Sequence, residues 1–240
     1  MARTHTSIEK MKKLRCTILG ILPFLFLPLL ISQTRPNTLH YQFQHLSESD
    51  GLASNLVHCG LLDSQGYMWF GTHTGLSRWD GLEFKNFHPN SSDSISMAPA
   101  LITDLLEDPN DHIWIASHNS PLCRFQSELQ KFETYPYPLL KDNSTINAAM
   151  KLYQDKAGII WIGIFDEGFL KFNPLTGEFK QFNLQNTLSS AESKFTHNSV
   201  VDILEDIVDA NILWLAANNG LYQFNKITGR WQRFVGNVMV

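Results

Sequence analysis

Hydrophobic and polar positions alternate along this chain in short blocks, and turn residues separate the blocks. The clearest copy lies around Trp69, where an apolar run over 57–62 precedes a turn at Gly66. Three further copies centre on Trp114, Trp161 and Trp214. Short aromatic and β-branched segments, punctuated about every ten residues, are typical of β-strands. No segment after residue 32 has a convincing helical period, so the pattern predicts an all-β chain.

The four tryptophans are 45, 47 and 53 residues apart. This period fits propeller blades or helical arrays, and the strand pattern favours blades. Each copy predicts four strands: an apolar strand, a strand holding the tryptophan, a third strand after a short turn, and a fourth with two aromatic residues three positions apart. The predicted first strands cover 57–62, 101–106, 149–153 and 200–204. Apolar residues flank each tryptophan on both sides, which predicts sheets that are covered on both faces.

Turn residues recur at fixed positions. An acidic residue follows each first strand: Asp63, Asp108, Asp155 and Asp206. Three residues before each tryptophan stand Gly66, Asp111, Gly158 and Asn211, residue types that tolerate a left-handed backbone. We expect the acids to cap tight turns through their own backbone rather than to form a ring of carboxylates. We expect Trp69, Trp114, Trp161 and Trp214 to be core residues between blades rather than a sugar-stacking platform.

The predicted fold is therefore an all-β propeller with about four four-stranded blades, over approximately 50–88, 95–136, 146–183 and 198–235. Residues 41–46 resemble a fourth strand without its first three, so they are predicted to be a closing strand. Such a strand removes exposed sheet edges in a closed propeller. Four blades that close as a ring remain an alternative. We favour an incomplete part of a larger, seven-bladed type of propeller, because the chain stops directly after a fourth strand.

The N-terminal segment differs from the rest. Five basic residues between Arg3 and Arg15 precede an apolar run over 16–31 that contains Pro23 and Pro28. This pattern predicts that residues 1–32 are a signal peptide, with a retained N-terminal membrane anchor as the alternative. Residues 33–40 are read as a linker to the propeller repeats over 41–240.

The net charge limits the classes of possible partners, and the cysteines bear on disulfide and metal binding. Without residues 1–32, the chain has 14 Lys and Arg against 22 Asp and Glu, a net charge of −8. This charge argues against nucleic acid and against an anionic membrane surface as partners. Cys59 and Cys123 occupy different repeat positions, so two buried thiols are expected, with a disulfide as the alternative. Neither has a Cys or His at metal-ligand spacing, and no cofactor is expected.

The repeat resembles a known family. Asp50-Gly51-Leu52, Asp63-x-x-Gly66-x-x-Trp69-x-Gly71-Thr72 and Gly75-Leu76 with Asp80-Gly81 are similar to the two-component regulator propeller repeat. The third copy keeps Asp155, Gly158, Trp161, Gly163 and Gly168, and the fourth keeps Asp206, Trp214, Gly220 and Leu221. The second copy departs most, with Asp111, Ala116 and Pro121 at the expected glycine positions. The resemblance covers roughly residues 41–235.

The resemblance implies an extracytoplasmic sensor segment of a membrane-bound signalling protein, on the periplasmic side of the bacterial inner membrane. The intact protein would carry a transmembrane helix and a histidine kinase or diguanylate cyclase output domain. It would bind an unknown small molecule or glycan, and a homodimer through the sensor would pass the signal. Membrane attachment would come from the N-terminal segment or from a C-terminal helix that this sequence lacks. A free-standing periplasmic binding or scaffold propeller and a propeller enzyme are the alternatives.

The candidate ligand-binding residues follow the second strand of each repeat, where polar side chains gather in short turns. They are His73, His118, Asn119, Asp166, Glu167, Asn218 and Asn219. Solvated hairpin turns explain the same residues without a ligand. His58 is read as a hydrogen-bonded core or channel-lining histidine rather than as a metal ligand. The sequence contains no hydrolase elbow, zinc-protease motif, phosphate loop or dinucleotide fingerprint, and no catalytic residue is proposed.

Overall fold

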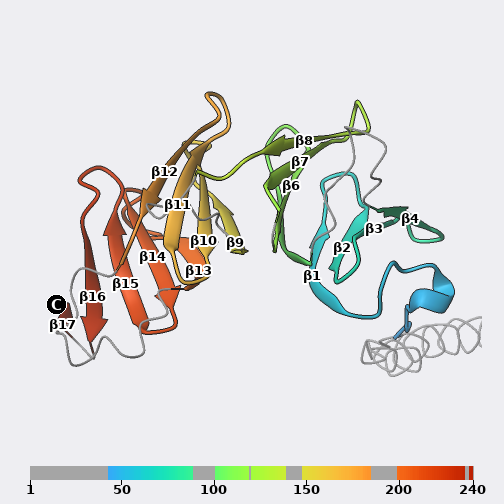
Figure 1. Ribbon diagram of the computed structural model, residues 1–240, viewed down its shortest axis with the longest axis horizontal. Helices are drawn as coiled ribbons and strands as arrows, with labels where there is room; N and C mark the ends of the chain where they lie inside the picture. Colours follow the sequence, from blue (N-terminus) through green and yellow to red (C-terminus); the bar gives the residue numbers. More distant parts are fainter. Residues whose placement is uncertain are drawn as a thin grey trace, which may run out of the picture. The chain divides into compact units, whose positions relative to one another are not determined.

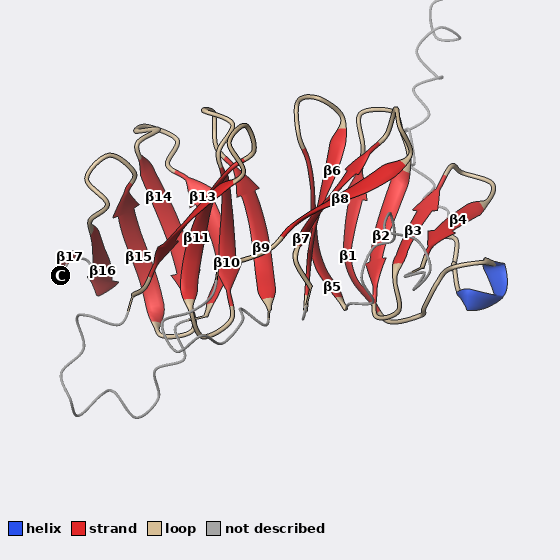
Figure 2. Ribbon diagram, turned by 45° about the horizontal axis from the view of Figure 1, so that its top comes forward, coloured by secondary structure: helices blue, strands red, loops and turns tan. Residues whose placement is uncertain are grey.

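The computed structural model describes residues 43–88, 101–118, 120–138, 148–184, 199–235 and 238–239. These residues form a short 3₁₀ helix, η1 (Glu48–Asp50), and four antiparallel sheets (Figures 1 and 2). Each sheet is built from one continuous stretch of sequence, so each appears in Figure 1 as a narrow band of colour. The sequence-predicted all-β propeller blades are confirmed.

Each sheet contains a four-stranded meander, which we call a blade. Blade 1 consists of β1 (Val57–Leu62), β2 (Met68–Thr72), β3 (Leu76–Trp79) and β4 (Phe84–Phe87). Blade 2 consists of β5 (Ile102–Glu107), β6 (His112–Ser117), β7 (Leu122–Gln126) and β8 (Lys131–Tyr135). Blade 3 consists of β9 (Ala149–Gln154), β10 (Ile160–Ile164), β11 (Gly168–Asn173) and β12 (Glu178–Phe182). Blade 4 consists of β13 (Val200–Glu205), β14 (Ile212–Ala217), β15 (Gly220–Asn225) and β16 (Trp231–Val235), and the short β17 (Val238–Met239) pairs with β16.

The register between strands repeats from blade to blade. The tryptophan of each second strand pairs with one residue of the first strand, as in Trp69 with Leu61 and Trp161 with Tyr153. It also pairs with one residue of the third strand, as in Trp69 with Arg78. All four first strands contain a bulge near their start, between Val57 and Cys59 in blade 1. The blades are therefore copies of one structural unit.

The hydrophobic core lies in the seams between consecutive blades. In each seam the tryptophan of one blade packs against aliphatic and aromatic residues from the first three strands of the next blade. Trp161, for example, shares a cluster with Val200, Leu215 and Phe224 of blade 4. Trp69, Trp114 and Trp161 are each at most 1% exposed, which confirms the expected core position for these three. Trp214 is partly exposed, because no further described blade covers it.

The closing strand expected at 41–46 stays a prediction, and one expectation about a turn is corrected. Residues 43–46 form no strand, and residues 41–42 of the expected closing strand lie outside the described residues. A strand needs a sheet edge as its partner, and each described blade already has its own fourth strand. Asn211 does not have the left-handed backbone of Gly66, Asp111 and Gly158. The turn of blade 4 is longer, since Asp206 and Trp214 are eight positions apart instead of six.

Consecutive blades approach closely at the small residue that stands two positions after the tryptophan, which is Gly163 in blade 3. A Cβ on Gly163 would lie 2.2 Å from the carbonyl oxygen of Val200 in blade 4. We expect Gly163→Ala to lower the free energy of unfolding by about 1–3 kcal/mol. The added methyl group would clash with a backbone atom, which cannot move aside without displacing the strand of the next blade.

Gly60→Ala is the matched control for this prediction, to be measured in parallel by urea unfolding. Its Cβ would meet only the flexible end of Met68 at 3.2 Å, besides a backbone contact at 3.6 Å. We expect this change to be neutral or slightly stabilising, since glycine in a strand costs roughly 0.5–1 kcal/mol relative to alanine. Equal losses in both variants would contradict the close seam at Gly163.

Candidate functional site

The candidate ligand-binding residues lie in the turns between the second and third strands. Because consecutive strands are antiparallel, these turns and the starts of the first strands lie at the same end of the blades, which we call the candidate rim. A backbone hydrogen bond ties each turn to the residue just before the first strand of its own blade. These bonds join His73 to Leu56, His118 to Leu101, Phe165 to Ala148 and Asn218 to Ser199, at 2.9–3.1 Å. The four turns are therefore held in equivalent positions.

In blade 1, the rim carries an exposed histidine. The His73 side chain is exposed, and its ring centre lies 6.1 Å from that of His58 on β1. The neighbouring Thr72 is buried, and its Oγ1 donates to the Gly75 carbonyl oxygen at 2.8 Å. His58 is also exposed, which excludes a core position for it, and the channel-lining position stays a prediction. The rim of blade 1 therefore presents two imidazole rings to solvent.

In blades 2 and 3, the rim residues join one blade to the next. His118 is half-buried, and its backbone forms a β-bridge with Ala148 at the start of blade 3. Asp166 has a left-handed backbone, and its N–H donates to Ser199 Oγ at 3.0 Å. Ser199 Oγ in turn donates to Asp166 Oδ1 at 3.2 Å. Asp166 is therefore a residue of the seam to blade 4.

The other candidates differ in their exposure to solvent and in their hydrogen bonds. Glu167 is half-buried, and its carbonyl oxygen accepts a 3.4 Å hydrogen bond from Gln181 Nε2. Asn218 is exposed. Asn219 is half-buried, and its carbonyl oxygen accepts a hydrogen bond from Arg233. Asn119 lies outside the described residues.

The candidate residues line none of three surface hollows on the described part of the chain. These hollows are lined by other residues, one of them by Asn110, Asp111, His112 and Gln126 at the opposite end of blade 2. Of the candidates, the structure brings His73 close to His58 and Asp166 close to Ser199. The remaining candidates are distributed one turn per blade.

The acids after the first strands have two roles, of which the sequence predicted one. Asp63 Oδ1 accepts the backbone N–H groups of Gln65 and Tyr67, so it caps the turn as expected. Its Oδ2 accepts the indole N–H of Trp69 at 2.7 Å. The same indole bond recurs at 2.8, 2.9 and 2.7 Å for Asp108–Trp114, Asp155–Trp161 and Asp206–Trp214. The constant six-residue spacing in the first three repeats was the signal that could have revealed it.

A cation covers the indole ring in three blades. Arg78, Arg124 and Lys171 are the third-strand partners of the tryptophans, and their charges lie 5.7, 5.3 and 5.9 Å from the respective ring centres. Gln223 takes this position in blade 4. A cation above an aromatic face is attracted by the ring electrons. Each of the first three tryptophans is thus fixed by a carboxylate at its edge and a cation above its face.

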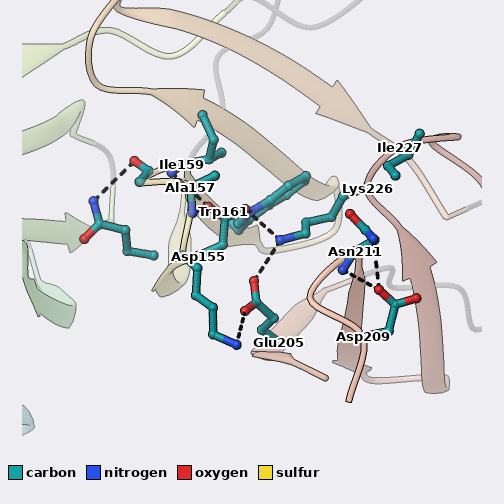
Figure 3. A network of polar contacts seen from close by, with 12 residues as sticks. Asp155, Ala157, Ile159, Trp161, Glu205, Asp209, Asn211, Lys226 and Ile227 are labelled. Atoms are coloured by element: carbon teal, nitrogen blue, oxygen red, sulfur yellow. Dashed lines mark hydrogen bonds and ion pairs between the residues drawn. The ribbon is translucent and has the colours of Figure 1, made fainter. Parts of the chain in front are cut away.

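A polar network crosses the seam between blades 3 and 4 at the end opposite the candidate rim. Figure 3 shows Lys226 between Asp155 and Glu205. Its Nζ lies 3.1 Å from Asp155 Oδ2 and 2.7 Å from Glu205 Oε2. The side chains of both carboxylates are only 3% exposed, and that of Lys226 is 14% exposed. Lys156, whose side chain is 75% exposed, lies 3.3 Å from Glu205 Oε1.

The network shifts the pKa values of its members. Burial favours the neutral carboxyl of Asp155, but hydrogen bonds from Trp161 and Lys226 outweigh it and lower the Asp155 pKa. The pKa of Glu205 is lowered in the same way, against burial, by Lys226 and Lys156. Burial favours neutral Lys226, but its bonds to Glu205 and Asp155 outweigh burial and raise the pKa of the ammonium. The charged forms are thus favoured in the folded protein.

Three further observations concern the cysteines, metal ligands and helices of the described part of the chain. Cys59 and Cys123 are free, so the alternative of a disulfide between them is excluded, and burial raises the pKa of each thiol to about 12. The described side chains contain no cluster of three or more His, Cys, Asp or Glu residues that could hold a metal ion. No helix within these ranges has the length and hydrophobicity needed to cross a membrane.

Comparison with known proteins identifies the fold. No protein-family profile and no curated protein matches the sequence. Among solved structures, the extracellular domain of the putative hybrid two component system BT3049 from B. thetaiotaomicron matches 82% of this chain, with a TM-score of 0.67 and 22% identity. The extracellular domain of the putative one component system BT4673 from the same organism matches 76%, with a TM-score of 0.59 and 22% identity. Sqt1 from Saccharomyces cerevisiae matches 73%, with a TM-score of 0.55 and 15% identity.

The matched region is a minor part of the larger proteins. The chain spans 27% of the BT3049 structure, 22% of the BT4673 structure and 48% of the Sqt1 structure. At these identities the similarity concerns the fold. In fold, the chain is a β-propeller segment of the kind present in the extracellular domains of these two B. thetaiotaomicron signalling proteins.

Proposed function

We propose that this chain is part of the extracytoplasmic ligand-sensing propeller of a membrane-bound two-component signalling protein. One observation carries this proposal: 82% of the chain superimposes on part of the extracellular domain of a putative hybrid two component system. The basic and apolar N-terminal segment supports export to the periplasmic side of the inner membrane. In the intact protein, ligand binding would change the packing or dimer geometry of the sensor, and a membrane helix would pass this change to the output domain.

The outer face of blade 4 supports a larger propeller. This face carries Leu204, Leu221 and Phe234, which are 59%, 39% and 36% exposed, beside the partly exposed Trp214. The residues equivalent to Leu221 in the other blades are Leu76, Leu122 and Phe169, and each is fully buried in a seam. A face of this kind is covered by the next blade at all three described seams. We therefore propose that a further blade of the intact protein covers it.

The same exposed face weighs against the alternative of four blades that close as a ring. Such a ring would bury Leu204 and Leu221 against blade 1. At the positions where the other blades present Leu, Ile, Cys or Tyr to the preceding tryptophan, blade 1 has Gly60 and Ser77. Blade 1 thus has smaller side chains at these two positions than blades 2 to 4.

The candidate rim is the ligand surface that we propose for the sensor, with a small molecule or a glycan as ligand. His73 and Asn218 are the best probes, because both side chains are exposed and their replacement leaves the seams intact. Asp166 is a poor probe, since its bond to Ser199 belongs to the seam.

A thermal-shift screen with mono- and oligosaccharides tests this function. A ligand present at 100 times its Kd stabilises a protein by about 2.7 kcal/mol, which is easily measured. We expect His73→Ala or Asn218→Ala to reduce the shift that a true ligand produces, without changing the melting temperature of the free protein. A ligand that stabilises both variants as well as the wild type would place the binding site elsewhere. The gene sequence after Val240 gives a second test, which requires further blades, an apolar span of about 20 residues and kinase or cyclase motifs in frame.

A further inference from the structure

Two exposed histidines lie side by side in blade 1. His58 is on β1, and His73 directly follows β2. Their ring centres are 6.1 Å apart, and the ring planes are inclined by 47°. Both side chains are exposed to solvent. The pair is therefore accessible to a dissolved ion.

The backbone fixes both positions. The register between β1 and β2 shifts between Val57 and Cys59, so His58 is the extra residue of a bulge. Bulges redirect a side chain relative to the regular strand. The N–H of His73 donates to the Leu56 carbonyl oxygen at 3.0 Å, and the adjacent turn is closed by the bond from Thr72 N to Gly75 O at 2.9 Å. The two rings are thus presented by a tied hairpin.

The other described blades do not have two histidines at the positions equivalent to His58 and His73. The bulge occurs in all four blades, and the residues equivalent to His58 are Thr103, Met150 and Val201. Blade 2 has His118 at the position of His73, but Thr103 stands opposite it. Among the four described blades, blade 1 alone combines two imidazoles. The pair is therefore not a requirement of the blade fold.

The geometry suits one chemistry. Imidazole nitrogens bind zinc at about 2.0–2.1 Å in a tetrahedral arrangement, which puts two rings that share one ion roughly 5 Å apart between centres. The observed separation is 6.1 Å, and because both side chains are exposed, a small rotation about their side-chain bonds would bring the rings to one ion. Imidazole favours Zn²⁺, Ni²⁺ and Cu²⁺, whereas Mg²⁺ and Ca²⁺ require oxygen ligands. With no described third protein ligand, solvent would fill the remaining positions on the ion.

We propose that His58 and His73 form a two-histidine site that binds one divalent transition-metal ion of the Zn²⁺, Ni²⁺ and Cu²⁺ class. The ion links β1 to the turn after β2, so it stabilises blade 1 at the candidate rim. This site does not depend on the proposed sensor function.

The test uses Zn²⁺ as the probe and the chain without a polyhistidine tag, at about pH 7.5, where a typical imidazole is neutral. Calorimetric titration is expected to show one saturable Zn²⁺ site, and Zn²⁺ is expected to raise the melting temperature. His58→Ala and His73→Ala are each expected to weaken Zn²⁺ binding at least about tenfold. Replacing a residue that only hydrogen-bonds to a metal ligand already lowers metal affinity by about this factor. Without metal, both variants are expected to melt like the wild type, because both side chains are exposed.

His118→Ala is the matched control, because it removes a histidine from the equivalent turn that lacks a histidine partner. It is expected to bind Zn²⁺ as the wild type does, and Mg²⁺ is expected to leave all proteins unchanged. The proposal is overturned if the wild type shows no saturable Zn²⁺ binding. It is equally overturned if His58→Ala or His73→Ala binds Zn²⁺ as tightly as His118→Ala.

Discussion

Replacing Trp161 by alanine is expected to lower the free energy of unfolding by about 3–5 kcal/mol, as is usual for a large buried aromatic residue. Its side chain is 1% exposed and fills the seam between blades 3 and 4, beside Phe169 and Phe224. The substitution also leaves Asp155 Oδ2 without its indole partner. Urea unfolding of the variant and the wild type measures this loss.

Trp214→Ala is the matched control for this prediction. Trp214 has the same place in its blade and the same bond to an aspartate, at 2.7 Å, but no described blade covers it and it is partly exposed. We expect a clearly smaller loss, because less apolar surface is removed from the protein interior. Similar losses for Trp161→Ala and Trp214→Ala would show that packing across the seam does not stabilise the fold.

Replacing Lys226 by methionine is expected to cost about 3–5 kcal/mol, which is typical when one partner of a buried ion pair is removed. Asp155 and Glu205 are both buried, and Lys226 bridges them at 3.1 and 2.7 Å. Methionine retains most of the side-chain volume, so the loss reports on charge rather than on a cavity. Chemical denaturation at neutral pH measures it.

Lys156→Met is the control for Lys226. Lys156 also pairs with Glu205, at 3.3 Å, but its side chain is 75% exposed. Exposed ion pairs contribute only about 0–1 kcal/mol, so a small effect is expected. Comparable losses at Lys156 and Lys226 would contradict a special role for the buried bridge.

The network also predicts how stability depends on pH. Because the pKa values of Asp155 and Glu205 are lowered by folding, their contribution is present above the ordinary carboxyl pKa values and is lost as acid protonates them in the folded state. The pKa of Lys226 is raised, so its contribution is present below the ordinary lysine pKa and is lost in strong alkali. Stability should therefore fall below about pH 4. Lys226→Met should weaken this acid dependence.

The sequence predicted the blades because their signals are local. The positions of Trp69, Trp114 and Trp161 between apolar neighbours, and of Gly66 and Gly158 in turns, follow from strand and turn chemistry alone. The left-handed backbone expected at Asn211 was wrong, because two additional residues lengthen the turn of blade 4. Counting three positions back from the tryptophan does not reveal this longer turn. The closing strand expected at 41–46 stays a prediction, because its pairing depends on the edge of a partner blade, which is a non-local property.

The candidate site could be predicted only in part. The turns after the second strands do lie at one end of the blades, as expected, but the sequence could not show which polar residues join neighbouring blades. Asp166 and Ser199 are 33 positions apart and meet across a seam, and Lys226 reaches Asp155 from 71 positions away. The pairing of His58 with His73 depends on a bulge, which alters the regular alternation of side chains.

The central claim is that consecutive sheets pack face to face as propeller blades, with the tryptophan as a contact between them. A double-mutant cycle on Trp161 and Phe224 tests it directly, because their rings lie 5.6 Å apart and belong to blades 3 and 4. The leucine variants Trp161→Leu and Phe224→Leu, with the double variant, should give a coupling energy of about 0.5–1.5 kcal/mol. The same cycle on Trp161 and Phe125, which packs in a different seam, should give none. Additive losses for Trp161 and Phe224 would contradict the packing of blade 3 against blade 4.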